Sequence, residues 1–106
     1  MKLALIITGN DAETVWNAFR YGAYAAGQGE TVTAFLLGKG VEAERIEDAR
    51  FDVRAQMQRL LDAGGTIRAC GTCLELRGTE SAATCPVSTL ADLHQMVVES
   101  DRVLTF

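Results

Sequence analysis

The sequence has little proline, no long apolar run and no cluster of basic residues. Only one proline, Pro86, stands among 106 residues, against 10 glycines, and hydrophobic residues make up 48%. This balance argues against a disordered chain and favours a compact fold with tight turns. A chain of this length suits one hydrophobic core, so we expect a single domain over residues 1–106.

The longest apolar runs are too short for a membrane helix. They are LALII and AFLLG, whereas a helix that crosses a bilayer needs about 20 apolar residues. The formal net charge is −4. Without a basic cluster, the sequence predicts no positively charged patch that would bind nucleic acid or an anionic membrane. We therefore expect neither nucleic acid nor a membrane as a partner.

The chain carries three cysteines but no recognisable leader sequence. It begins directly with a strand-like run, without a basic region, an apolar segment and a small-residue cleavage site. Cysteines in such a chain indicate a compartment in which thiols stay reduced. We expect the protein to be cytoplasmic.

Strand and helix patterns alternate along the chain. Apolar or β-branched runs predict strands at residues 2–8, 31–37, 66–69 and 102–106. Helical spacing predicts helices from Ala12 to about Gly27, over 53–61, and from a cap at Ser88 or Thr89 to just before Arg102. The charged stretch 41–49 predicts a loop or a short helix. This order predicts an α/β fold with a mostly parallel sheet of four to five strands and helices on both faces.

The spacing of apolar residues assigns a core face to the first and last helices. The core side chains expected are Val15, Ala18, Phe19, Gly22 and Ala26 on the first, and Leu90, Leu93 and Val97 on the last. Trp16, Tyr21 and Tyr24 are left over on the first helix. Aromatic residues at such positions indicate packing, here between subunits, rather than ligand binding.

The stretch RACGTCLELRG, residues 68–78, places Cys70 and Cys73 in a Cys-x-x-Cys motif. Cys70 follows a predicted strand, and open parallel sheets collect reactive groups at the carboxyl ends of their strands. Gly71 and Thr72 would begin a short helix whose N–H groups and dipole favour a thiolate on Cys70. Arg77 would either support that charge or only complement the helix dipole. The alternative hypothesis is that Cys70 is an inert buried thiol.

The chain also resembles a known family. Cys70 followed by Arg77 and Gly78, the closing segment STLADLHQMVVESDRVLTF and the first strand MKLALIITG are similar to the DsrE/DsrF-like sulfur-relay family. The resemblance implies a three-layer α/β/α sandwich and assembly into homotrimers or hexamers. It also implies that Cys70 carries sulfur as a persulfide, received from a sulfur-donor protein and passed to an acceptor protein.

The second cysteine leaves two other functions open. Cys73 stands where better-understood relatives usually have a small or apolar residue, and it could resolve a Cys70 persulfide by forming a disulfide. A dithiol–disulfide redox protein using Cys70 and Cys73 is therefore one alternative. A non-catalytic interaction subunit, with an unreactive Cys70, is the other.

Metal and cofactor sites have weaker support. Cys70, Cys73, Cys85 and His94 could supply four zinc ligands, but a structural zinc site normally uses two paired cysteine motifs and this chain has one. Thr8-Gly9-Asn10 with Thr14 is similar to a phosphate-binding loop, yet Asp11 and Glu13 would repel phosphate. We expect neither a metal nor a cofactor.

Overall fold

The computed structural model describes residues 1–79 and 85–106 and has an α/β fold with one five-stranded sheet. The strands are β1 (Lys2–Ile7), β2 (Thr31–Leu36), β3 (Thr66–Cys70), β4 (Val87–Ser88) and β5 (Arg102–Thr105). Every pair of neighbouring strands is parallel, and the spatial order is β4-β3-β2-β1-β5. The carboxyl ends of all five strands therefore meet at one edge of the sheet.

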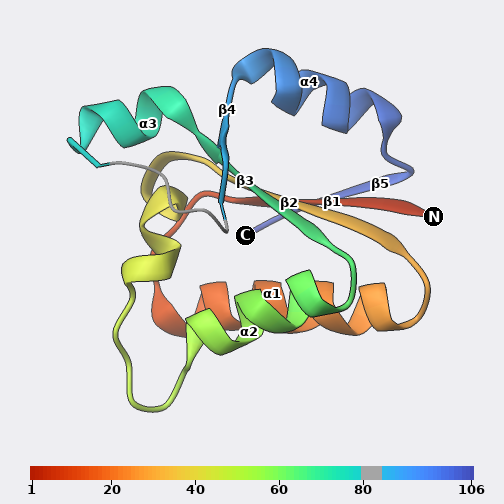
Figure 1. Cartoon of the computed structure of the whole chain (residues 1–106), viewed down its shortest axis with the longest axis horizontal. Helices are drawn as coiled ribbons and strands as arrows, with labels where there is room; N and C mark the ends of the chain where they lie inside the picture. Colours follow the sequence, from red (N-terminus) through yellow and green to blue (C-terminus); the bar gives the residue numbers. More distant parts are fainter. Residues whose placement is uncertain (80–84) are drawn as a thin grey trace.

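Helices cover both faces of this sheet. They are α1 (Ala12–Gly27), α2 (Val53–Asp62), α3 (Gly71–Leu76) and α4 (Leu90–Glu99), together with the 3₁₀ helix η1 (Gly38–Arg45). Figure 1 shows α1 and α2 on one side of the sheet and α3 and α4 on the other. The predicted α/β class with helices on both faces is confirmed, as is the three-layer arrangement that the resemblance implied.

Most of the predicted elements lie within one or two residues of their observed bounds. The charged stretch after β2 forms η1 and then a loop, and α4 begins at the predicted cap Thr89. The sequence did not identify β4, because two residues beside Pro86 are too short to show a strand pattern. This strand pairs Ser88 with Cys70 and adds an edge next to the cysteine motif.

The first helix packs on the sheet as its spacing predicted. All five residues assigned to its core face are buried. Gly22 lies at the point of closest packing, where an added Cβ would be 2.8 Å from Leu5 Cδ1 on β1. Trp16 is partly buried against the ring of Phe51, with centroids 5.4 Å apart, so it contributes to packing within the chain.

The predicted core face of α4 is correct for Leu93 and wrong for Leu90 and Val97. Leu90 is 67% exposed and Val97 38% exposed, and no residue of this helix is buried. Leu93 packs against the core as a partly buried side chain, together with Met96, which was not predicted. The helix crosses a stretch of sheet that is partly polar, with Thr33 and Thr66 joined by a hydrogen bond of 3.0 Å, and this leaves less apolar surface to cover.

The turn Gly38-Lys39-Gly40 brings η1 against the end of β1. A Cβ built on Gly40 would be 1.9 Å from the carbonyl oxygen of Ile7. Gly38 has φ of +57°, a left-handed conformation that favours glycine. Both glycines are therefore required by the backbone path, and the turn sits directly on the carboxyl-terminal edge of the sheet.

In the part of the chain that the structure describes, none of the helices is both long and apolar enough to span a bilayer.

We predict that Gly40→Ala destabilises the fold, because its methyl group would collide with a backbone oxygen that cannot rotate away. The expected loss is about 1–3 kcal/mol of unfolding free energy, measured by urea denaturation. Gly27→Ala is the matched control, since a Cβ there meets nothing within 4 Å; it should be neutral or stabilising by up to about 1 kcal/mol. Equal losses in both variants would contradict the proposed close approach.

Candidate functional site

Cys70 lies at the carboxyl-terminal edge of the sheet, as predicted. It is the last residue of β3 and also the N-cap of α3, and it is only 4% exposed. Its neighbour across the ladder is Ser88, whose hydroxyl donates a 2.8 Å hydrogen bond to Asp92 on α4. Cys70 therefore lies where β3, β4 and the start of α3 meet.

The charge state of Cys70 is set mainly by burial. Burial raises the pKa of the Cys70 thiol above its ordinary value of 9.0, and the nearby Cys73 thiol raises it further. The backbone N–H groups of Cys73 and Thr72 lower the pKa, but their effect is smaller, and the side chain forms no capping hydrogen bond. Burial therefore opposes the helix-start amides, which favour a thiolate on Cys70 as expected.

Cys73 has a different environment. It is the third residue of α3 and half-buried, and its Sγ accepts a 3.2 Å hydrogen bond from the backbone N–H of Gly38. Both cysteines are thiols rather than a disulfide. The site therefore contains two adjacent sulfur atoms, one nearly inaccessible and one accessible and held by a backbone amide.

Arg77 does not lie against the Cys70 sulfur. Its Nε donates to Glu42 on η1 at 3.0 Å, and one terminal nitrogen donates to the carbonyl oxygen of Cys73 at 3.1 Å. The second contact is the helix-end interaction that was one of its two predicted roles. The ion pair between Arg77 and Glu42 connects α3 to η1, and so keeps Cys73 beside the Gly38 turn.

Gly71 and Thr72 shape the start of α3 by different means. A Cβ on Gly71 would be 3.0 Å from Val87 on β4, so the absent side chain lets the helix start close to the edge strand. The Thr72 side chain is exposed, and its contribution is the amide that faces Cys70. Both residues act on the site through the backbone.

Cys85 and His94 do not join the thiol pair. Cys85 is 1% exposed and belongs to the hydrophobic core, while His94 is exposed on α4. Among residues 1–79 and 85–106, no group of three or more His, Cys, Asp or Glu side chains is arranged to hold a metal ion.

Polar side chains in the loop after β1 form hydrogen bonds within the chain. Asp11 caps α1 and accepts hydrogen bonds from the Thr14 amide and hydroxyl, at 3.0 and 2.9 Å, which lower the pKa of this carboxyl group. The Thr8 hydroxyl donates to the carbonyl oxygen of Phe106. These contacts occupy both threonine hydroxyls and the Thr14 amide, and the cap places a carboxylate at the helix start.

The sequence analysis missed the role of Gly38. It identified Gly38-Lys39-Gly40 as a turn after the second strand but did not connect it with the cysteines. The available signal was topological: β2 and β3 are neighbours in a parallel sheet, so the segments that follow them share one edge. A turn after β2 is therefore expected near a helix that follows β3.

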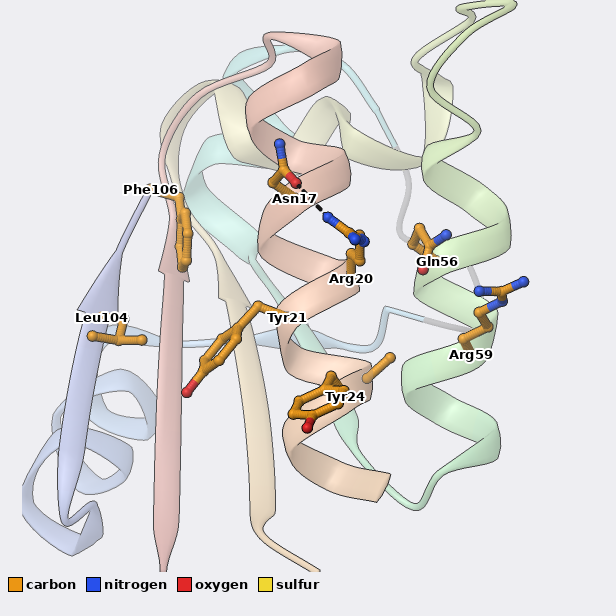
Figure 2. A pocket seen from close by; sticks show the side chains of 9 residues that line it. Asn17, Arg20, Tyr21, Tyr24, Gln56, Arg59, Leu104 and Phe106 are labelled. Atoms are coloured by element: carbon orange, nitrogen blue, oxygen red, sulfur yellow. Dashed lines mark hydrogen bonds between the residues drawn. The ribbon is translucent and has the colours of Figure 1, made fainter. Parts of the chain in front are cut away.

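A separate hollow of about 770 Å³ lies on the opposite side of the sheet. Figure 2 shows Tyr21 pointing from α1 toward the strand side of the hollow, where Leu104 of β5 and the following Phe106 lie, while Arg20 and Gln56 lie between α1 and α2. Tyr24 and Arg59 complete its polar and aromatic lining. No cysteine lines this hollow, so it is distinct from the thiol site.

Comparisons with known proteins agree with this architecture. An uncharacterised protein of Methanocaldococcus jannaschii is 31% identical to the chain, with all of both chains covered. The crystal structure of the YchN protein from Escherichia coli matches all of both chains with a TM-score of 0.84 at 21% identity. A conserved protein of unknown function from Bacteroides thetaiotaomicron has a TM-score of 0.75 at 23% identity, covering 99% of this chain and 94% of that one. These two structures are similar in fold.

The family comparison covers the whole length of the chain. The model of the DsrE/DsrF-like family matches residues 1–106, a span that includes both cysteines, the Gly38 turn and the closing strand. Together with the full-length archaeal relative, this match shows that the chain belongs to the DsrE/DsrF-like family.

Proposed function

We propose that this chain is a sulfur-relay protein that accepts sulfane sulfur on Cys70 as a persulfide and passes it to another thiol. The observation that carries the proposal is the place of Cys70, at the carboxyl end of β3 with two backbone amides facing its sulfur. Membership of a family related to sulfur relay supports it. The donor and the acceptor are proteins that present a persulfide and a thiol.

The chemistry requires only sulfur nucleophiles. The Cys70 thiolate attacks the outer sulfur of a donor persulfide, forms a new S–S bond and releases the donor as a thiolate. An acceptor thiolate then attacks the outer sulfur on Cys70, and the Cys70 thiolate leaves. Amides of Thr72 and Cys73 stabilise negative charge on the sulfur in each step.

Burial gives this thiol a specific behaviour. Because burial raises the pKa of the Cys70 thiol, we expect loading of this sulfur to be slow at neutral pH and faster as the pH rises. A protein donor that docks would hold its persulfide in place while the thiol ionises. Three cysteines kept as thiols suit a reducing compartment, so we also place the protein in the cytoplasm.

We further propose that the chain assembles with copies of itself as a homotrimer or hexamer. Among residues 1–79 and 85–106, β1 is the one strand that pairs with the edge strand β5, and all four residues of β5 are exposed, including Val103 at 38% and Leu104 at 37%. Tyr21 and Tyr24 border the same hollow as Leu104. An unpaired strand edge beside exposed aromatic and aliphatic side chains is the kind of surface that a second copy covers.

Sulfur loading tests the role of Cys70. A Cys73→Ser chain incubated anaerobically with glutathione persulfide should gain about 32 Da per chain, the mass of one sulfur atom. The matched Cys70→Ser, Cys73→Ser chain should not, because the accepting sulfur is gone. Intact-protein mass spectrometry measures the gain. An equal gain in both chains would exclude Cys70 as the acceptor, and no gain in either would favour an interaction subunit without sulfur chemistry.

Light scattering after size exclusion tests the assembly. The wild-type chain should have a molar mass that is an integral multiple of 11.4 kDa, three or six chains. Leu104→Glu should reduce that mass at micromolar concentration, because assembly would bury an unpaired carboxylate. Ala49→Glu adds the same charge on an exposed loop and should leave the mass unchanged. A folded wild-type monomer would contradict the proposal.

A further inference from the structure

The start of α3 places two sulfur atoms side by side. Cys70 is the N-cap and Cys73 the third residue of the helix, and the Cys73 thiol is near enough to raise the pKa of the Cys70 thiol. The two thiols are not joined in a disulfide. A nucleophile for any sulfur carried on Cys70 is therefore part of the same helix turn.

We infer that Cys73 is a resolving thiol, which attacks a persulfide on Cys70 and releases its outer sulfur as the hydrosulfide ion, HS⁻. This inference rests on the proposed function, because it requires sulfur on Cys70. It adds a second outcome for that sulfur: besides transfer to an acceptor protein, the chain itself reduces it to sulfide.

The Gly38 amide holds Cys73 in position for this attack. Its nitrogen lies 3.2 Å from Cys73 Sγ, and the donated hydrogen bond orients the side chain. The thiolate of Cys73, not the thiol, is the form that attacks. The close approach of Gly40 to the carbonyl oxygen of Ile7 determines the position of the turn. The ion pair between Arg77 and Glu42 connects η1 to the helix that carries Cys73.

Accessibility decides which sulfur of the persulfide each nucleophile reaches. Cys70 is 4% exposed, so its own Sγ is less accessible to a thiol from outside than the added outer sulfur, which extends a further S–S bond away from the backbone. An acceptor protein therefore attacks the outer sulfur and receives it. Cys73 lies beside the inner sulfur and attacks there, which makes the outer sulfur the leaving group.

The step balances without an external oxidant. Cys73 Sγ forms a bond to Cys70 Sγ, the bond between Cys70 Sγ and the outer sulfur breaks, and the electron pair leaves with HS⁻. The sulfane sulfur is reduced, and the two cysteines are oxidised to a disulfide. A dithiol reductant then returns both cysteines to thiols by exchange, so the class of partner that this cycle requires is a dithiol protein or small dithiol.

The experiment follows hydrosulfide and intact mass after anaerobic loading with glutathione persulfide. Three chains are compared: wild type, Cys73→Ser, and Cys85→Ala as a control that removes a thiol outside the pair. Wild type and Cys85→Ala should release about one HS⁻ per chain and end about 2 Da below the reduced mass, as a Cys70–Cys73 disulfide. Cys73→Ser should instead retain the gain of about 32 Da until an external thiol is added.

The outcomes separate this inference from the proposed function. A wild-type chain that retains its added sulfur as long as Cys73→Ser would overturn the resolving role while leaving sulfur carriage intact. Disulfide formation at the same rate with glutathione disulfide in place of the persulfide would also overturn it, since ordinary exchange would then account for the product. If Cys73→Ser gains no sulfur on Cys70, the proposed function fails and this inference fails with it.

Discussion

The close approach of Gly40 to the carbonyl oxygen of Ile7 is the constraint on which the candidate site depends. It presses the turn after β2 onto the end of β1, where only a residue without a Cβ fits. The turn then directs the Gly38 amide toward α3, where it meets Cys73. A contact between two backbone segments, far from either cysteine in the sequence, thus determines how one of the two sulfur atoms is held.

Two cysteines on one helix turn acquire different properties from their surroundings. Cys70 is buried as the last residue of its strand, and burial raises the pKa of its thiol more than the helix-start amides lower it. Cys73 lies one turn further along, half-buried, with a hydrogen bond to its sulfur. In the function that we propose, the buried sulfur stores a transferred atom and the half-buried sulfur displaces it.

The fold could be predicted from the sequence because its signals are local. Apolar runs, glycine turns and the Thr89 cap each mark an element boundary within a few residues. The site was predicted only in part. Position at a strand end identified Cys70, but burial depends on how β4 packs beside it, and β4 is a two-residue strand without a sequence pattern. Leu90 and Val97 of α4 were misassigned to the core because periodicity does not show how polar the sheet beneath the helix is.

The unequal environment of the two thiols is the central claim, and competitive alkylation tests it most directly. The reduced chain is treated with limiting iodoacetamide at about neutral pH, and peptide mapping measures how fast each cysteine is labelled. We predict that Cys73 is labelled before Cys70, and that labelling of Cys70 becomes appreciable only as the pH rises past its ordinary value of 9.0. Labelling of Cys70 ahead of Cys73 at neutral pH would contradict the account.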